Sequence, residues 1–502
     1  MQFSNYAGLP GMVIALGSLL GSCAAPEPNP VLQAADEKLN QLVAEINPLP
    51  SLSVALVHEG EVVFLNAYGF ANLEDSVMAT PETLYYLASV TKPFMATVAA
   101  RLDQQGRIKL EALLSDYEPY ASLDSAHLYA EVTVEDLLTH TSGLRNDALT
   151  FRESGSGEKN PEVFSYLLNQ GTTVAEDGKE YDYDNLGYNL YSRILEAELG
   201  QTWQEVLQTQ LLDPLALTQT SSSASAPSTQ GMAEAIPYIP FPVDAPSPSP
   251  LRKRDNTMHS AGGMFASAHD LSKWLLANLE AGDLLDEALL PKVHTPRYPA
   301  DSNPFHKIAA DEIALGWRVG QYEGQRVLHH SGSFAGAYAH ISLMPDQQAG
   351  VVVLTNEFFT GLKVGYPIEE QLYRYVLGLP AFDSTFDASI ASLKKELAEM
   401  GAGLMAQREA IAARPFQLSQ PLEAYEGTFT NDLYGTLKVT PEDGSLRFQM
   451  GNITTLATGY PHDDVVRVEL TPLSGELIQF QLENDQPQRL RAKGVWFEKT
   501  SS

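Results

Sequence analysis

The 502-residue chain is poor in cysteine, in basic residues and in long hydrophobic runs. Its single cysteine, Cys23, excludes an intrachain disulfide. Lysine and arginine total 32 against 63 acidic residues, so the net charge is −31 and the surface should repel nucleic acid and anionic lipid headgroups. We therefore expect no nucleic-acid partner. The apolar content of 44% still suffices for a sizeable core.

Two common catalytic motifs are also missing. No Gly-x-Ser-x-Gly sequence occurs, which disfavours an α/β-hydrolase. His58-Glu59 lacks the second histidine of a zinc-protease helix, and no other cluster of metal ligands stands out. We therefore expect neither a metal nor another cofactor.

The N-terminal segment resembles a bacterial lipoprotein signal. Its apolar stretch, residues 12–20, is too brief to span a bilayer and is followed by Leu-Gly-Ser-Cys23 and a proline-rich segment. The resemblance implies a signal peptide over residues 1–23, lipidation of Cys23 and a membrane tether on the periplasmic side of a bacterial envelope, most naturally at the outer membrane. The alternatives are an ordinary secretory signal with a secreted product, or a plain N-terminal tail.

A serine three residues before a lysine can act as a nucleophile with a nearby amine. This spacing occurs three times, at Ser89/Lys92, Ser156/Lys159 and Ser392/Lys395. Ser156 lies in a glycine-rich stretch that predicts a flexible turn. Ser392 lies in an amphipathic helical pattern and is expected to face solvent.

Ser89 has a different setting, because it follows an apolar run and precedes Pro93 and a helical pattern. Proline is tolerated only in the first turn of a helix, so this helix cannot begin much before Ser89. There the helix dipole favours developing negative charge, and Lys92 lies over the same face. Burial could lower the pKa of a lysine from ~10.4 to roughly 7–8, where it can act as a base. The alternative is a capping serine beside a solvated lysine.

Two further motifs complete a possible active site. Tyr183-Asp-Asn185 offers a phenol and an amide, and His330-Ser-Gly332 offers an imidazole and a glycine at a strand edge. Such groups can attack a carbonyl through an acyl-serine. The structural alternatives are a packing tyrosine, a helix-capping Asn185, a strand histidine and a close-approach glycine.

The run Leu-Ala-Ser-Val-Thr-Lys-Pro-Phe at residues 87–94 resembles the signature of the serine β-lactamase and penicillin-binding-protein superfamily. It is most similar to the branch of class C β-lactamases, D-aminopeptidases, DD-carboxypeptidases and family VIII esterases. Residues 133–144, 181–188 and 260–271 are similar to other segments of this branch. The likeness covers roughly residues 31–380.

The resemblance implies a role for each motif residue. Ser89 would be the acylated nucleophile and Lys92 its amine partner, while Tyr183 would share the base and proton-shuttle role. Asn185 would bind a substrate amide. The oxyanion hole would consist of the backbone N–H groups of Ser89 and Ser333.

His330 departs from the β-lactamase pattern, in which a lysine usually holds the carboxylate of the drug. A histidine is mostly neutral at pH 7, so this anchor is weaker and true β-lactamase activity is a less favoured alternative. With Gly332 and Ser333, His330 would form the substrate-binding strand. His140 follows a short helix that begins with a capping box at Thr133, so we interpret it as structural rather than catalytic.

The predicted fold class is α+β. The resemblance implies an antiparallel sheet flanked by helices, with a helical subdomain, over residues 31–380. A connector with an amphipathic helix would follow over 381–417, and short alternating strands predict a small all-β domain over 418–502. That last domain resembles lipocalin-like accessory domains; it could gate the cleft, mediate oligomerisation or have no ligand of its own.

The favoured function is a serine hydrolase that acts through an acyl-enzyme on an amide, ester or D-amino-acid peptide bond of a small-molecule or peptide substrate. The alternative from a different class is a non-catalytic binding or sensor protein with the same cleft. The motifs do not choose among substrates, because substrate preference depends on loop shape.

Overall fold

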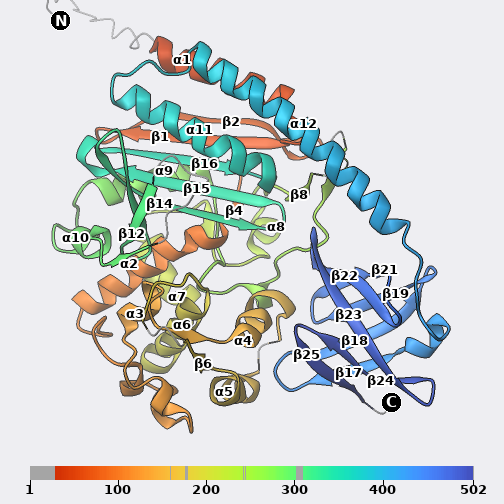
Figure 1. Cartoon of the computed structure of the whole chain (residues 1–502). Coiled ribbons are helices and arrows are strands. Elements are labelled where there is room, and N and C mark those ends of the chain that lie inside the picture. Colours follow the sequence, from red (N-terminus) through yellow and green to blue (C-terminus); the bar gives the residue numbers. More distant parts are fainter. Residues whose placement is uncertain are drawn as a thin grey trace, which may run out of the picture.

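The computed structural model describes residues 29–158, 160–175, 179–240, 242, 245–300 and 309–500. The expected signal peptide and the lipidation site Cys23 lie outside these residues. The described chain forms a sheet with helices on both faces, a helical subdomain below it, and a separate β-rich unit at the C-terminal end (Figure 1).

The central sheet has nine described strands in the order β11-β12-β13-β14-β15-β16-β1-β2-β3, and every neighbouring pair is antiparallel. Its strands are β1 (Ser51–His58), β2 (Glu61–Asn72), β3 (Val77–Met78), β11 (Tyr298–Pro299), β12 (Ala309–Ile313), β13 (Arg318–Tyr322), β14 (Gln325–Phe334), β15 (Ala337–Met344) and β16 (Ala349–Thr355). The central strands β15 and β16 are buried at every position; β16 is apolar up to its last residue, Thr355, whereas β15 also buries His340 and Ser342. The predicted α+β class with an antiparallel sheet is confirmed.

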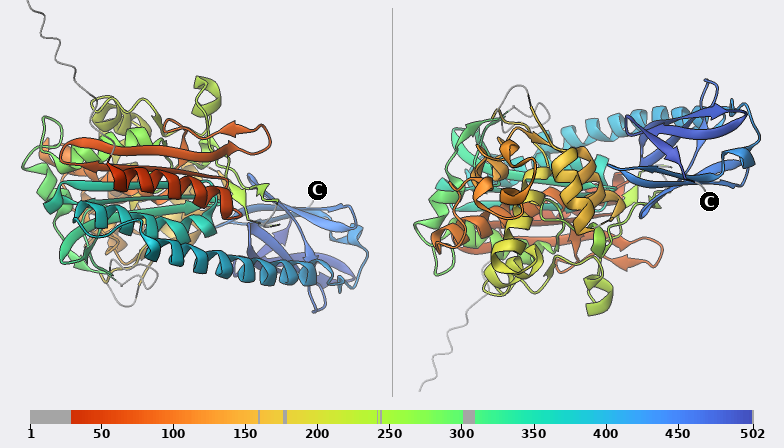
Figure 2. Two further views of the ribbon diagram at one scale, coloured as in Figure 1. Left: turned by 90° about the horizontal axis from the view of Figure 1, so that it is seen from above. Right: turned by 90° about the horizontal axis from the view of Figure 1, so that it is seen from below.

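Helices cover both faces of this sheet (Figures 1 and 2). One face packs against α1 (Pro30–Glu45), α11 (Phe358–Val376) and α12 (Ser384–Ala412), the other against α2 (Thr91–Gln104) and α9 (Ala268–Leu279). Because side chains alternate along a strand, Val351 and Val353 join the core beside α11, while Val352 and Leu354 join the core beside α2 and α9. Alternate residues of one strand therefore join the cores on opposite faces of the sheet.

The helical subdomain and its neighbouring segments contain α3 (Val134–Leu138), α4 (Asp147–Phe151), α5 (Pro161–Gln170), α6 (Leu186–Leu199), α7 (Trp203–Leu207), α8 (Ala226–Gln230) and α10 (Leu289–His294). Short strands accompany them: β4 (Tyr85–Tyr86), β5 (Leu144–Arg145), β6 (Thr173–Val174), β7 (Thr220–Ser221), β8 (Tyr238–Ile239), β9 (Ser247–Pro248) and β10 (Phe265–Ala266). The expected capping box of α3 is present between Thr133 and Asp136. Gly187 lets α6 approach α3 closely, because a Cβ there would lie 2.1 Å from Leu137 O.

The stretch around Ser156 differs from the prediction of a flexible turn. It forms a π-helical turn, Arg152–Ser156, in which Ser156 is 1% exposed. The backbone N–H of Asn452, from the C-terminal unit, donates to Ser156 O at 3.0 Å. Packing against another part of the chain orders this glycine-rich stretch, a long-range effect that its local sequence does not reveal.

The C-terminal unit is a nearly closed nine-stranded β barrel that follows the long helix α12 (Figure 2). Its strands are β17 (Gly427–Asn431), β18 (Gly435–Glu442), β19 (Ser445–Met450), β20 (Ile453–Leu456), β21 (Thr458–Gly459), β22 (Val465–Thr471), β23 (Ser474–Glu483), β24 (Gln486–Ala492) and β25 (Val495–Lys499). Buried side chains such as Phe429, Phe448 and Phe480 pack in one core cluster. The predicted all-β C-terminal domain is confirmed.

Candidate active site

Ser89 lies in a tight turn that leads into α2. A 3₁₀ turn over Ala88–Val90 precedes the helix, and Pro93 is its third residue, as the sequence predicts. Ala88 has a φ of +46°, a left-handed conformation that costs energy for a residue with a side chain. This strained turn presents the half-buried Ser89 at the start of the helix.

Lys92 has no exposed surface, and three hydrogen bonds hold its ammonium. Its Nζ donates to Ser89 Oγ at 3.1 Å, to Asn185 Oδ1 at 2.7 Å and to Ala261 O at 2.8 Å. Burial lowers the pKa of Lys92 to about 7, against an opposing effect of the Asp184 carboxylate. Near neutral pH a large fraction of this amine is therefore uncharged and able to accept a proton.

Tyr183 lies beneath the same ammonium, with Lys92 Nζ 4.9 Å from its ring centroid. The residue as a whole is 40% exposed, but its hydroxyl interacts with Ser89, and burial of that hydroxyl raises the pKa of Tyr183 to about 12. The phenol is therefore protonated at neutral pH. This geometry favours Lys92 as the base and Tyr183 as a proton donor, which narrows the shared role expected from the sequence.

Asn185 directly precedes α6 at the N-cap position, but its side chain makes no capping hydrogen bond. The carboxylate of Asp184 accepts from Gly187 N at 3.0 Å instead, which leaves the Asn185 amide oxygen on Lys92. Of the two interpretations of Asn185, the structure supports a site residue rather than a side-chain cap.

His140 packs against the Tyr183–Asn185 segment. Its Nδ1 accepts from Asp184 N at 3.3 Å, and its ring lies 4.5 Å from that of Tyr183. Burial and the charge of Lys92 hold the pKa of His140 well below its usual range, so the ring is neutral. The structural interpretation of His140 agrees with these contacts, although the sequence did not indicate that it packs on Tyr183.

Strand β14 forms the opposite wall of the site. Its pairing with β13 ends where Arg318 faces His329, so among the described strands none pairs with residues 330–334 on that side. Gly332 lies against the Ser89 turn, since a Cβ there would stand 2.1 Å from Leu87 O and 2.6 Å from Ser89 N. Ser333 follows at the exposed edge, where its backbone N–H can complete an oxyanion hole with that of Ser89.

His330 is 4% exposed, and its Nδ1 lies 2.9 Å from Ser331 O, which assigns the ring proton to Nδ1. Burial and the nearby Lys92 hold the pKa of His330 well below its usual range, so His330 is uncharged at neutral pH. It therefore does not act as the cation that a lysine would supply at this position.

Arg318 supplies a cation that the sequence reasoning missed. It lies at the start of β13, donates from Nη2 to Tyr181 Oη at 2.8 Å, and lines the same cavity as Ser89 and His330. No recognisable sequence motif surrounds Arg318. It lies beside the cavity because it is the residue at which the pairing of β13 with β14 ends. The cavity thus has a guanidinium from another strand, although His330 itself is neutral.

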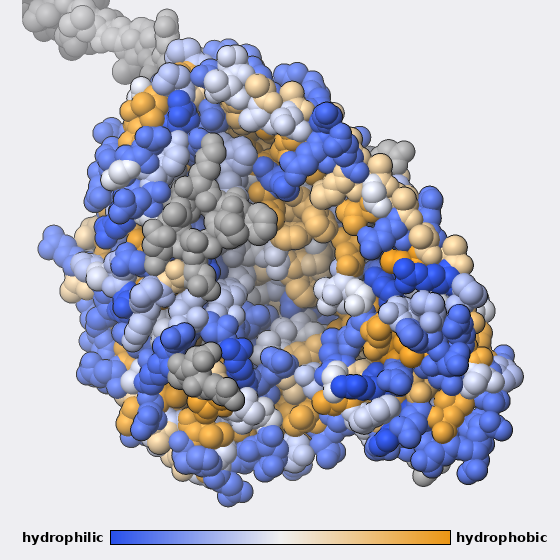
Figure 3. All heavy atoms as spheres, viewed as in Figure 1, coloured by the Kyte–Doolittle hydropathy of each residue, from blue (hydrophilic) through white to orange (hydrophobic). Residues whose placement is uncertain are grey.

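Ser89, Tyr183, Arg318 and the edge of β14 line one cavity of about 470 Å³, whereas Lys92 and Asn185 are not part of its lining. It is lined by Ser89, Tyr183, Arg318, His329, His330, Ser331, Gly332, Ser333, Tyr338, Phe358, Leu362 and Tyr366. The surface in Figure 3 is hollowed near its centre, between the sheet and the C-terminal barrel. The structure therefore brings together the predicted residues from the three motifs, and adds α11 side chains that no motif indicated.

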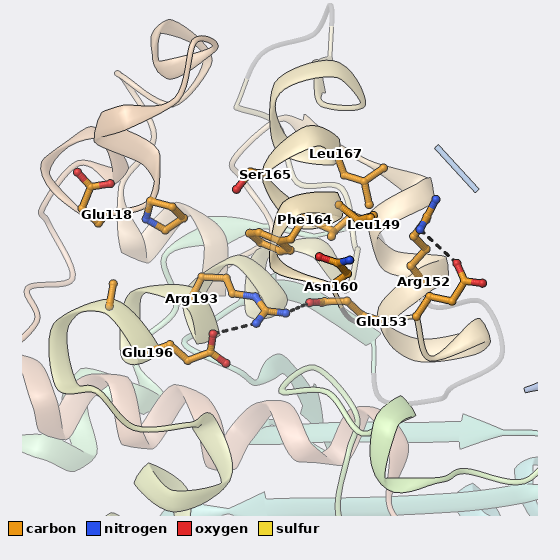
Figure 4. A pocket seen from close by; sticks show the side chains of 14 residues that line it. Glu118, Leu149, Arg152, Glu153, Asn160, Phe164, Ser165, Leu167, Arg193 and Glu196 are labelled. Carbon is orange, nitrogen blue, oxygen red and sulfur yellow. Dashed lines mark hydrogen bonds and ion pairs between the residues drawn. The ribbon is translucent and has the colours of Figure 1, made fainter. Parts of the chain in front are cut away.

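A second cavity, of about 490 Å³, lies in the helical subdomain (Figure 4). There Arg193 binds Glu153 and Glu196 and packs 4.4 Å above the Phe164 ring. No lysine is among the described residues that line it. Within the described ranges, no three histidine, cysteine or acidic side chains converge as a metal site. Ser89, which accepts a hydrogen bond from Lys92, thus lines the first cavity and not the second.

Part of this chain is similar in sequence to known proteins. Protein flp from Staphylococcus aureus (strain NCTC 8325 / PS 47) is 26% identical over 310 residues, which cover 61% of this chain and 60% of that protein. This chain thus matches only about 60% of the length of that curated relative.

Two solved structures share the fold. The octameric penicillin-binding protein homologue from Pyrococcus abyssi aligns with a TM-score of 0.57 and 20% identity, over 93% of this chain and 100% of that chain. The D-amino acid amidase from Ochrobactrum anthropi SV3, complexed with L-phenylalanine amide, aligns with a TM-score of 0.57 and 23% identity, over 70% of this chain and 98% of that chain.

The family model described as Beta-lactamase matches residues 39–369, a span that begins in α1, ends in α11 and includes the whole cavity wall. With a serine and lysine at the start of α2, a tyrosine and asparagine before α6 and a glycine edge on β14, this chain belongs to the Beta-lactamase family, and it shares its fold with the two solved structures.

Proposed function

We propose that this protein is a hydrolase that forms an acyl-enzyme on Ser89, and that its substrates are small amides or peptides of D-amino acids. The observation that carries the proposal is the buried Lys92 amine, 3.1 Å from Ser89 Oγ, with its pKa lowered to about 7. An amine that titrates near neutral pH can activate a serine hydroxyl, which is otherwise a weak nucleophile.

In the acylation step, neutral Lys92 accepts the hydroxyl proton of Ser89 while Oγ bonds to the substrate carbonyl carbon. The backbone N–H groups of Ser89 and Ser333 stabilise the resulting oxyanion. Tyr183 transfers its proton to the leaving nitrogen and regains one from Lys92 as the carbon–nitrogen bond breaks. A water molecule then cleaves the ester, with Lys92 again as the base, and restores Ser89.

Three features support the substrate class. A cavity of about 470 Å³ fits a small molecule or a short peptide. The fold is shared with a D-amino acid amidase. The Arg318 guanidinium and the Ser331 and Ser333 hydroxyls line the cavity and can bind a carboxylate close to the scissile bond. β-Lactams, which also have a carboxylate, stay a less favoured alternative because His330 is neutral.

A covalent probe tests the acyl-enzyme. A fluorophosphonate and a fluorescent penicillin should each be offered to the folded protein, with tryptic mass spectrometry to locate the adduct. We expect an adduct on Ser89 and none in Ser89→Ala, while the Ser392→Ala variant on exposed α12 labels like the wild type. No adduct from either probe, on protein with native circular dichroism, would contradict the proposal and favour a non-catalytic binding protein.

A panel of substrates then tests whether D-amino acid amides are the preferred substrate class. Release of ammonia from D-phenylalanine amide should exceed hydrolysis of p-nitrophenyl acetate, of L-phenylalanine amide and of a β-lactam in kcat/KM. All turnover should vanish in Ser89→Ala. A protein that turns over only the β-lactam would contradict the D-amino-acid assignment while leaving the acyl-serine intact.

We also propose that the protein is a lipoprotein of a bacterial envelope, on the basis of the segment that ends in Cys23. None of the described helices is both long and apolar enough to cross a bilayer. Expression in a bacterial host with a labelled fatty acid should mark the wild-type chain and not Cys23→Ser. An unlabelled wild-type chain released into the medium would contradict the tether.

A further inference from the structure

The C-terminal barrel holds one short turn of the helical subdomain at both ends. The turn is the π-helical segment Arg152–Ser156, which follows α4 and lies beside the barrel (Figure 1). At its start, the buried Arg152 guanidinium donates to Leu433 O at 2.6 Å and to Asp432 O at 3.0 Å, in the β17–β18 connection. At its end, Ser156 O accepts the backbone N–H of Asn452, from the β19–β20 turn.

The barrel and this turn meet in close contact. Gly451 has a φ of +55°, and a Cβ on it would lie 2.2 Å from Ser156 O. The side chain of Asn452 also donates at 2.8 Å to Asn256 Oδ1, and Asn256 Nδ2 donates to Gly157 O at 3.0 Å. The barrel therefore fixes the turn and the segment around Asn256 relative to each other.

Lys253 lies between the turn and the end of strand β14. Its Nζ donates at 2.6 Å to Ser154 O, the central carbonyl of the turn. The same ammonium lies 4.1 Å from the ring centroid of Phe334 and 6.0 Å from that of Tyr86. A cation over an aromatic face is attracted by the ring. Lys253 thus links the turn that the barrel holds to the last residue of β14.

The position of Phe334 matters because it directly follows Ser333, the second donor of the proposed oxyanion hole. On the side away from β15, no described strand pairs with these two residues, so side-chain contacts help to fix them. Phe334 packs against Tyr86 with ring centroids 5.8 Å apart, and Tyr86 packs on Phe265 at 5.1 Å. This aromatic group joins the end of β14 to the segment that leads into the Ser89 turn.

We propose that Lys253 is a positioning residue for the oxyanion hole, and that the C-terminal barrel affects turnover by holding Lys253 in place through the Arg152–Ser156 turn. The inference rests on the proposed function, to which it adds a residue outside the three motifs and a role for the barrel. Lys253 is not among the described residues that line the Ser89 cavity, so it acts through Phe334 on the Ser333 N–H and not on the substrate.

Hydrogen exchange tests the contact without turnover. Lys253→Met keeps the length of the side chain but removes its charge and its hydrogen bond to Ser154. We expect exchange in the peptide that covers residues 330–336 to become roughly 10-fold faster, because the end of β14 opens more often. Lys253→Arg, which keeps a cation and a donor, should exchange like the wild type. So should Lys395→Met, whose lysine side chain is 80% exposed on α12.

Kinetics then test the consequence for turnover. Lys253→Met should lower kcat for D-phenylalanine amide, and the rate of fluorophosphonate labelling, roughly 10- to 100-fold, the cost of a small misplacement of a catalytic donor. KM should change less than about twofold, since the oxyanion contact forms only in the transition state. The acid limb that Lys92 sets near pH 7 should stay in place. Lys253→Arg should restore most of the rate.

A pair of glycine variants tests the barrel. Gly451→Ala should press on Ser156 and lower kcat in the same way as Lys253→Met. Gly444→Ala is the matched control, because Gly444 lies in the β18–β19 turn with a φ of +74° and no atom within 4 Å of an added Cβ. Both variants place alanine in a left-handed conformation, so a difference between them reports the contact with the turn.

Four results would overturn the inference. They are wild-type exchange and rates in Lys253→Met, equal losses in Lys253→Met and Lys253→Arg, equal rates in the two glycine variants, and a loss confined to KM or a displaced acid limb, which would show an effect on the substrate or on Lys92. If Lys253→Met lacks native circular dichroism, the two glycine variants decide the question. Faster exchange in Lys253→Met without labelling of wild-type Ser89 would contradict the proposed hydrolase and leave the positioning contact standing.

Discussion

Gly332 and Ser89 touch across the floor of the cleft, and a Cβ on Gly332 would lie 2.6 Å from the Ser89 backbone nitrogen. We therefore expect Gly332→Ala to push β14 away from the nucleophile. The loss of one aligned oxyanion donor should lower kcat/KM for D-phenylalanine amide about 10²- to 10³-fold. The overpacked contact should lower the free energy of unfolding by about 1–3 kcal/mol, as urea denaturation can measure.

Gly403→Ala is the matched control. Gly403 lies inside α12, and no atom lies within 4 Å of a Cβ added there. Alanine in a helix interior stabilises by roughly 0.5–1 kcal/mol relative to glycine, so this variant should keep full activity and unfold at slightly higher urea. Equal activity of both variants would show that the close approach at Gly332 has no catalytic consequence.

The pKa of Lys92 predicts the pH dependence of acylation. Burial lowers this pKa to about 7, and only the neutral amine accepts the Ser89 proton. Below pH 7 the neutral fraction falls tenfold per unit, so kcat/KM should rise with a slope near one between about pH 5 and 7 and level off above. Initial rates on D-phenylalanine amide measure this profile, and a flat profile across that range would rule out Lys92 as the base.

The charge of Asp184 should shift the pH dependence of kcat/KM. Its carboxylate raises the pKa of Lys92, while burial raises the pKa of Asp184 itself to about 6. Asp184→Asn removes the charge and keeps an oxygen for Gly187 N, so the acid limb should move to lower pH by about one unit, the size of one partly screened charge interaction. A shift to higher pH would contradict this electrostatic assignment.

Arg318 should control the binding of anionic substrates. Replacing its guanidinium by an amide in Arg318→Gln should raise KM for D-alanyl-D-alanine or a penicillin roughly 10-fold or more, as expected for one charge-assisted contact. Arg318→Lys keeps the charge and should lose less. Steady-state kinetics with D-phenylalanine amide as the reference separates this effect from general damage, and equal losses on both substrates would contradict the assignment.

The three motifs identified the fold and most of the cleft because each is local. Pro93 limits where α2 begins, which places Ser89 and Lys92 on one turn, and Asn185 directly precedes α6. The alternating strands after α12 likewise predicted an all-β unit from residue spacing alone. Where the local pattern was ambiguous, as at Ser156, the prediction of a flexible turn was wrong because a distant loop packs on it.

Residue order and local conformation were thus enough to identify a family, and a serine and lysine that we propose as nucleophile and base. The ionisation of Lys92, the neutrality of His330 and the arrival of Arg318 at the Ser89 cavity were decided only by the folded chain. These properties depend on desolvation and on the register of strands that are distant in sequence. Residues adjacent in sequence determine neither the strand register nor a pKa. Register is set by burial across the whole sheet, and a pKa is set by the charges and the dielectric around the group.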